Sequence, residues 1–79
     1  MRGASLMAVR KVSSEVAGSV WEIQVAVGDQ VAADDILIVI ESMKMELPVA
    51  SPFSGTVKAI HVEKGDLVEE GQAVVDLEA

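Results

Sequence analysis

The residue with the clearest chemical potential in this sequence is Lys44, which lies between two methionines. The segment from Glu41 to Pro48 reads Glu-Ser-Met-Lys-Met-Glu-Leu-Pro, so Met43 and Met45 flank the amine directly. An apolar run precedes this segment and a short strand-like stretch follows it, which predicts a hairpin. A tight hairpin normally has Asn-Gly, Asp-Gly or another glycine at its tip, and this tip has none. Local violations of this kind are typical of functional sites.

Three interpretations of Lys44 compete. The amine is a solvated charge that blunts a strand edge, a catalytic amine, or a point to which another enzyme attaches a group. A catalytic amine must be deprotonated, which requires desolvation or a neighbouring cation, whereas Glu41 and Glu46 carry negative charge and favour the ammonium. The third interpretation suits an exposed hairpin tip, because the active site of a partner enzyme can surround it.

The composition excludes several other classes of function. The chain has 79 residues with 13 acidic and 6 basic side chains, and its net charge of −7 argues against nucleic acid and anionic membranes as partners. The absence of cysteine excludes a disulfide scaffold, a thiolate metal site and a cysteine nucleophile. His61 is the only histidine, so a metal site or a Ser-His-Asp arrangement lacks partners, and we predict a surface histidine. The longest apolar run, residues 36–40, is too short to span a membrane, and a signal peptide is absent, so we expect a cytoplasmic protein.

An internal repeat predicts the elements that position Lys44. Residues 18–25 match residues 55–62, and the match continues in register to residue 41 against residue 78, with a constant offset of 37. Each copy reads as a strand, a Gly-Asp turn, a short strand and an apolar strand. Gly28 and Gly65 supply the positive φ angle that such a tight turn requires.

Two such halves, each too small to bury its own apolar face, are expected to pack against each other. We predict an all-β fold, a flattened antiparallel barrel or sandwich of two four-stranded sheets with pseudo-twofold symmetry (a barrel-sandwich hybrid). Pro48 indicates an edge strand. Trp21 stands where the second copy has Lys58, which indicates partial exposure, either through partial packing or for contact with a partner. The predicted strands are residues 8–13, 19–26, 30–32, 36–41, 45–50, 55–62, 67–69 and 73–78.

The motif from Glu41 to Glu46 resembles the biotin-attachment motif of biotinyl domains, the carrier domains of biotin-dependent carboxylases. The resemblance runs from about Val12 to Glu78 and includes the repeat and its Gly-Asp turns. Ser42 stands where the commonest family motif has alanine. The first copy carries no insertion of the kind called a thumb, so the resemblance is to the short thumbless type. Lipoyl domains share the fold but typically carry Asp-Lys-Ala at the tip.

This resemblance implies a role for each residue of the motif. Lys44 would receive biotin in amide linkage from a biotin protein ligase. Met43 and Met45 would form part of the surface that the ligase recognises, although one of them could instead fill the core beneath the hairpin. Glu41 and Glu46 would guide the choice of ligase, with solvated charges as the alternative interpretation.

The implied function is that of a non-catalytic carrier. It would carry carboxyl groups on biotin between the biotin carboxylase and carboxyltransferase subunits of a biotin-dependent carboxylase, because a tether raises the local concentration of the cofactor at each site. We expect residues 1–7 to be a flexible leader and residues 8–79 to form the carrier domain. Two alternatives remain: a lipoyl carrier of an acyl-transfer complex, and a structural or interaction domain with an unmodified lysine.

Overall fold

The computed structural model describes residues 8–79, and these residues form an all-β domain. No segment of residues 8–79 forms a helix that is long and apolar enough to cross a membrane. The leader expected at residues 1–7 lies outside the described residues. The strands, which agree with the predicted ones to within three residues at each end, are β1 (Val9–Ser13), β2 (Gly18–Ile23), β3 (Gln30–Val31), β4 (Ile36–Ser42), β5 (Met45–Ala50), β6 (Gly55–Ile60), β7 (Leu67–Val68) and β8 (Ala73–Glu78).

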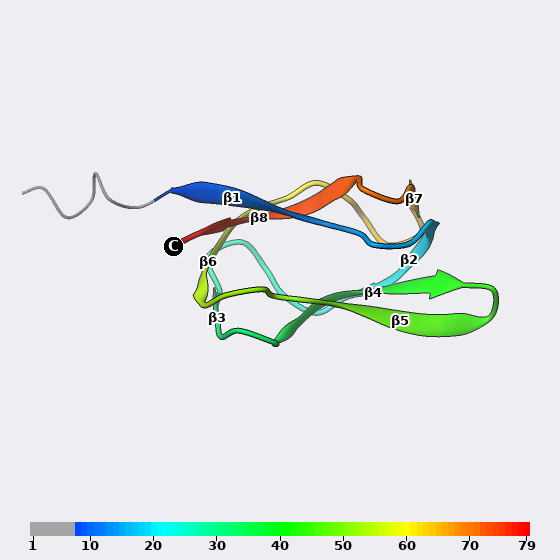
Figure 1. Ribbon diagram of the computed structural model, residues 1–79, viewed down its shortest axis with the longest axis horizontal. Helices are drawn as coiled ribbons and strands as arrows, with labels where there is room; N and C mark the ends of the chain where they lie inside the picture. The colour runs from blue at the N-terminus through cyan, green and yellow to red at the C-terminus, as the bar shows by residue number, and fades with distance from the viewer. Residues whose placement is uncertain (1–7) are drawn as a thin grey trace, which may run out of the picture.

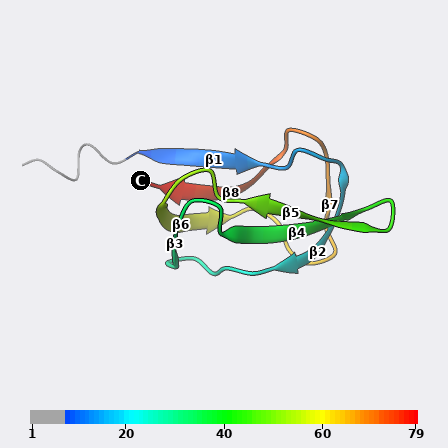
Figure 2. The same cartoon turned by 60° about the horizontal axis from the view of Figure 1, so that its bottom comes forward.

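The eight strands form two four-stranded sheets, as predicted. The strand order is β1-β8-β6-β3 in one sheet and β5-β4-β2-β7 in the other, and every pairing is antiparallel. Figures 1 and 2 show the two layers lying one over the other, with the β4–β5 hairpin extending from one end. Pro48 lies in β5, which is an edge strand as expected.

The repeat of 37 residues corresponds to a pseudo-twofold relation between the two sheets. An offset of 37 takes β1 to β5, β2 to β6, β3 to β7 and β4 to β8, so the strand order of one sheet becomes that of the other. The pseudo-twofold relation covers more of the chain than the sequence repeat indicated, because it also relates β1 to β5. The buried Ser14 and Ser51 show this, since each hydroxyl donates to the backbone carbonyl two residues later, both at 2.6 Å.

Each half of the chain closes onto the other through its Gly-Asp turn. The N–H of Gly28 donates to the carbonyl of Val57, and that of Gly65 donates to the carbonyl of Val20, both at 2.8 Å. The φ angles of the two glycines are 97° and 94°, as the turn interpretation requires. Because the turn of each half is bonded to a strand of the other, neither half forms its sheets alone.

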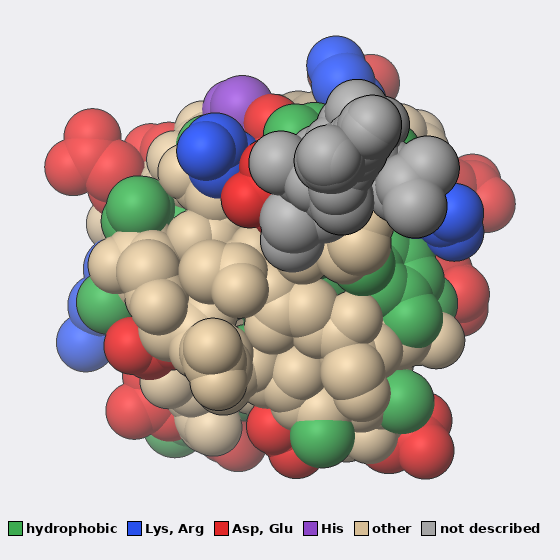
Figure 3. All heavy atoms as spheres, turned by 90° about the vertical axis from the view of Figure 1, so that its left-hand side faces the viewer, with side chains coloured by type: hydrophobic (Ala, Val, Ile, Leu, Met, Phe, Trp, Pro, Cys, Tyr) green, Lys and Arg blue, Asp and Glu red, His purple; other side chains and the backbone are tan. Residues whose placement is uncertain are grey.

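The core is made almost entirely of β-branched and leucine side chains from both sheets. β4 contributes the fully buried Leu37, Ile38 and Ile40, and burial of each such side chain stabilises the fold by roughly 1.5–3 kcal/mol. Acidic side chains are spread around the outside, as the view from the end where β1 begins shows (Figure 3). The buried cluster comprises Val12, Val20, Val31, Leu37, Ile38, Ile40, Val49, Val57, Val62, Val68, Val74, Val75 and Leu77.

β2 and β4 approach each other so closely at Gly18 that a side chain there has no room. A Cβ atom there would lie 2.8 Å from Cγ2 of Ile40 and closer still to the carbonyl oxygen of Glu41. We expect Gly18→Ala to destabilise the fold by about 2–3 kcal/mol, because the backbone of β4 must move. Gly28→Ala is the control: it meets nothing within 4 Å and suffers only from its positive φ, at about 1 kcal/mol. Urea denaturation measures both, and equal losses would contradict the close approach.

Candidate functional site

Lys44 lies at the tip of the β4–β5 hairpin, which closes with a loop of only two residues. Ser42 pairs with Met45, so Met43 and Lys44 alone form the turn and Met45 is already the first residue of β5. The tip is therefore one residue shorter than the Met-Lys-Met tip expected from the sequence. The hairpin is anchored at its base, because the β4 residue Ile40, which pairs with Leu47, lies within the core.

Both residues of the turn adopt a left-handed backbone conformation. The φ angle is 54° at Met43 and 66° at Lys44. The sequence offers no residue suited to this conformation, yet the two-residue connection between twisted antiparallel strands imposes it. A non-glycine residue held there costs of order 1–3 kcal/mol, so the pairing of β4 with β5 holds the tip in a strained shape.

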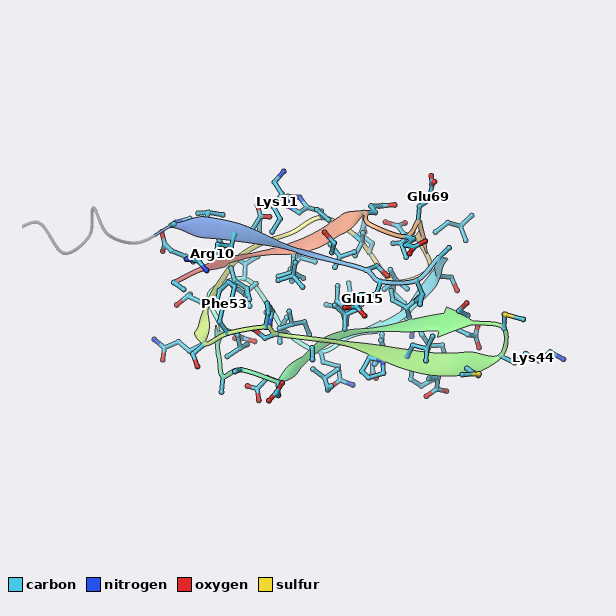
Figure 4. The ribbon with its side chains drawn as sticks, in the orientation of Figure 1. Arg10, Lys11, Glu15, Lys44, Phe53 and Glu69 are labelled. Atoms are coloured by element: carbon cyan, nitrogen blue, oxygen red, sulfur yellow. The ribbon has the colours of Figure 1, made fainter. Side chains whose placement is uncertain are left out.

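The side chain of Lys44 is exposed and extends away from the body of the molecule (Figure 4). Within residues 8–79 the one ion pair joins His61 to Asp76, so no carboxylate there holds the amine. The exposed tip also offers no desolvation, which a catalytic amine needs. This geometry favours an amine presented to another protein over an amine that reacts within a site of its own.

The two methionines beside Lys44 face solvent. Met43 is 92% exposed and Met45 is 56% exposed. Neither fills the core beneath the hairpin, so the alternative that one of them does is wrong. Large apolar side chains exposed together at the end of a hairpin are costly to hydrate and are typical of surfaces that contact another molecule.

Glu41 and Glu46 lie directly opposite each other, one residue pair behind the tip. Their Cα atoms are partners across β4 and β5, and both side chains are exposed. Like charges at directly opposed positions of a sheet destabilise the pairing by about 0.2–1 kcal/mol. The hairpin thus combines a strained turn, exposed methionines and opposed carboxylates, three features that folding alone disfavours.

A second polar arrangement lies away from the hairpin and was not predicted in full. Nε2 of His61 lies 3.0 Å from Oδ2 of Asp76, while the other carboxylate oxygen is buried without a partner. His61 is exposed, as expected. Asp76 was missed, although a carboxylate within the apolar strand β8 was a signal. Among residues 8–79 no three His, Cys, Asp or Glu side chains are grouped for a metal ion.

Comparison with known proteins relates the hairpin to a family. The family described as "Biotin-requiring enzyme" matches residues 7–77, which is nearly the whole chain. The chain belongs to this family. The resemblance to biotinyl domains, noted from the Met-Lys-Met motif and the repeat, is therefore confirmed as membership of this family.

Short relatives match over most of their length. The chain is 39% identical over 66 residues to the biotin/lipoyl attachment protein of Bacillus subtilis, covering 84% of this chain and 90% of the relative. It is 40% identical over 63 residues to the biotinylated protein TB7.3 homolog of Mycobacterium leprae, covering 80% of this chain and 89% of the relative. Of these two relatives of similar length, one is named for biotin and lipoyl attachment and the other for biotinylation.

Larger proteins contain a region similar to this chain. The crystal structure of the urea carboxylase of Kluyveromyces lactis matches with a TM-score of 0.84 and 40% identity, covering 89% of this chain and 6% of the carboxylase chain. A dihydrolipoyllysine-residue acetyltransferase component of pyruvate dehydrogenase complex, from Mycoplasma genitalium, is 46% identical over 57 residues, covering 72% of this chain and 15% of that protein. The family therefore includes relatives named for both cofactors.

The strain at the tip can be measured at Met43. We expect Met43→Asn to raise the free energy of unfolding by about 0.5–1 kcal/mol, because asparagine tolerates a left-handed backbone. Met45→Asn is the matched control: this residue lies in β5, where asparagine is disfavoured, so no gain is expected. Urea denaturation of both variants measures the difference, and a larger gain from the Met45 variant would contradict the strained turn.

Proposed function

We propose that this chain is a biotin carboxyl carrier in which biotin is attached by an amide bond to Nζ of Lys44. The observation that carries the proposal is the exposed Lys44 amine at the tip of a strained hairpin, in a chain that belongs to the biotin-requiring family. The residues present fit this group, because an amide needs one accessible amine, and space beyond the tip is open (Figure 4).

The attachment step requires one reaction at Lys44. Nζ, after losing a proton, attacks the acyl carbonyl of biotinyl-adenylate bound to a biotin protein ligase; the amide C–N bond forms and the bond to AMP breaks. Met43 and Met45 offer the ligase adaptable apolar contacts on either side of the amine. Glu41 and Glu46 present two carboxylates behind it, which favour a ligase with a basic surface around its active site.

The chain contributes to carboxylation by presenting the attached biotin to the active sites of other proteins. When bound, biotin supplies a ring nitrogen that accepts a carboxyl group at one active site and donates it at another. The β4–β5 hairpin holds the attachment point beyond the rest of the domain, and tethering raises the local concentration of biotin at each site. Ala8 and Ala79 exchange backbone hydrogen bonds of 3.0 and 3.1 Å, and Figure 1 shows this end of the sheets opposite the hairpin. Ala8 and Ala79 therefore lie far from Lys44 and do not block access to it.

The proposed partners are a biotin protein ligase, a biotin carboxylase and a carboxyltransferase. The proposal rests on relatives named as carboxylases, of which this chain spans a small part, and on relatives of nearly its own length. We propose a carrier and not an enzyme, because relatives of nearly its own length are named as an attachment protein and a biotinylated protein. A cytoplasmic location stays a prediction.

A lipoyl carrier is the second candidate, and the acetyltransferase relative favours it. The methionines on both sides of Lys44 speak against it, since lipoyl domains typically carry Asp-Lys-Ala at this tip. We expect a lipoate protein ligase supplied with lipoate and ATP to leave the chain unmodified, as measured by intact mass. A mass gain of one lipoyl group under conditions that leave the chain free of biotin would favour the second candidate.

Lys44→Arg tests the attachment site. We expect the wild-type chain to gain one biotinyl group from a biotin protein ligase with biotin and ATP. Lys44→Arg should gain none, because arginine keeps the charge and length but has no amine to acylate. Its stability should stay within about 0.5 kcal/mol of wild type, since the side chain is exposed. Intact mass measures loading and urea denaturation measures stability.

Lys58→Arg and Lys64→Arg are the matched controls, because both lysines are exposed and lie outside the hairpin. Each should load to one biotin per chain. A wild-type chain that stays unmodified while a known carrier is labelled would refute the proposed function, and loading of Lys44→Arg would refute the assignment of the residue.

A further inference from the structure

The oxidisable sulfur of the described residues is confined to the tip that bears Lys44. The sequence contains no cysteine, and between residues 8 and 79 its methionines are Met43 and Met45 alone. The buried cluster is built from valine, leucine and isoleucine side chains and holds no thioether. The sulfur atoms drawn in Figure 4 accordingly lie at the end of the β4–β5 hairpin. Thioether chemistry on residues 8–79 is therefore restricted to the two neighbours of the amine.

Both thioethers are open to small oxidants, but to different degrees. Met43 is 92% exposed and Met45 is 56% exposed. The difference follows from their positions, because Met43 belongs to the two-residue turn whereas Met45 is paired with Ser42 as the first residue of β5. Susceptibility to oxidation rises with exposure. We therefore expect Met43 to react before Met45.

Hydroperoxides are the oxidants that suit such a site, and the reaction transfers one oxygen atom. A lone pair on Sδ attacks one peroxide oxygen, so that an S–O bond forms and the O–O bond breaks. The departing oxygen takes up a proton and leaves as water or an alcohol. Sulfur loses two electrons and the peroxide gains them. The product is methionine sulfoxide, in which a polar S–O group replaces an apolar thioether.

Oxidation of these two methionines leaves the core untouched. Ile40 is the last core residue of β4, and its partner Leu47 lies two residues beyond Met45. A sulfoxide at either methionine meets solvent, whereas the same change within a core would disrupt its packing. The modification therefore alters the surface of the tip alone, and the exposed sulfoxide stays within reach of the reductases that reverse it.

The surface that oxidation changes is the one that an attachment enzyme must cover. A biotin protein ligase forms a bond to Nζ of Lys44, so its active site surrounds this side chain and the residues on either side of it. A carboxylase or carboxyltransferase acts instead on the ring of the attached group, beyond the end of the lysine side chain. Attachment is therefore the step tied most directly to Met43 and Met45.

The turn prevents an oxidised Met43 from withdrawing from the amine. Met43 and Lys44 alone connect β4 to β5, and their φ angles of 54° and 66° are imposed by the pairing of Ser42 with Met45. Moving Met43 away from Lys44 would require this pairing to open. A sulfoxide oxygen is thus held beside the amine, where an apolar ligase contact leaves it without a hydrogen-bond donor at a cost in free energy.

We propose that Met43 and Met45 form an oxidation site that controls the attachment of biotin to Lys44, and the inference rests on the proposed function. The reduced tip is a substrate of the ligase. The oxidised tip is folded but accepts biotin poorly, and reduction of the sulfoxides restores it.

Trypsin separates all four methionines of the chain, which makes the order of oxidation measurable. Cleavage after Lys44 places Met43 in residues 12–44 and Met45 in residues 45–58, while Met7 falls in residues 3–10 and Met1 in residues 1–2. The chain without biotin is exposed to hydrogen peroxide for increasing times, treated with catalase and digested for mass spectrometry. We expect the peptide of Met43 to gain oxygen before that of Met45, with the urea midpoint of the oxidised chain unchanged.

Loading of the oxidised chain tests the control of attachment. Peroxide is removed with catalase before biotin, ATP and a biotin protein ligase are added, because biotin also contains a thioether. We expect the kcat/KM of the ligase for the oxidised chain to fall about fivefold or more, the lower limit for one buried polar group without a partner. Methionine sulfoxide reductases of both stereospecificities should together restore it, since each reduces one sulfoxide epimer. Intact mass measures loading.

Two variants show whether the sulfur atoms at the tip are responsible, each compared with itself before and after peroxide. The double variant Met43→Leu with Met45→Leu keeps apolar side chains without sulfur, so its own kcat/KM should not change on treatment. Val27→Met, added to this double variant, places a thioether at a position that is 63% exposed and outside the hairpin. This thioether should be oxidised without any change in loading.

The outcomes separate this inference from the proposed function. An untreated wild-type chain that accepts no biotin refutes the proposed function and this inference with it. Normal loading before treatment, with loading of the folded, doubly oxidised chain within twofold of it, refutes the inference alone. A loss of loading that the leucine variant shares, or that accompanies unfolding, also overturns the inference, because the sulfur atoms of the tip are then not its cause.

Discussion

The antiparallel pairing of β4 with β5 is the constraint on which the site depends. β4 contributes three fully buried side chains to the core, and from Ile38 onward its pairing with β5 is regular as far as Ser42 and Met45. Only two residues remain to reverse the chain, and the twist of the strands then requires a left-handed backbone at both. The strain at Met43 and Lys44 is therefore balanced by burial far from the tip, and the amine is held outward without any side chain supporting it.

The pseudo-twofold relation separates what the fold requires from what it does not. The buried serines, the Gly-Asp turns and the β-bulges occur in both halves, so they belong to the scaffold. Among residues 8–79 the hairpin has no counterpart; at the equivalent end of the other sheet, Ala8 and Ala79 exchange backbone hydrogen bonds. Where a scaffold is symmetric, a feature present in one half alone needs a reason other than folding.

Much of the scaffold was predictable because its signals are local. Apolar periodicity and the repeat indicated all eight strands, and Gly28 and Gly65 indicated their turns. The inclusion of β1 and β5 in the symmetry was missed, since the few shared residues, such as Ser14 and Ser51, are too sparse to reveal a repeat. The position of Lys44 at a hairpin tip was predictable. The length of the turn, two residues, was not, because it depends on the register between β4 and β5, which the sequence leaves open. The contact between His61 and Asp76 is likewise non-local.

The unfavourable features of the hairpin are confined to its tip, and this confinement explains how the domain tolerates them. The exposed methionines, the opposed glutamates and the left-handed turn lie beyond Ile40, the last core residue of β4, and its partner Leu47, so none of them disturbs the packing between the sheets. A chain of 79 residues has little stability to spare, and strain within its core would threaten folding. Strain at the end of a well-anchored hairpin costs the same free energy but leaves the core intact. The residues of the tip can therefore differ in type without disturbing the pseudo-symmetric scaffold that holds them.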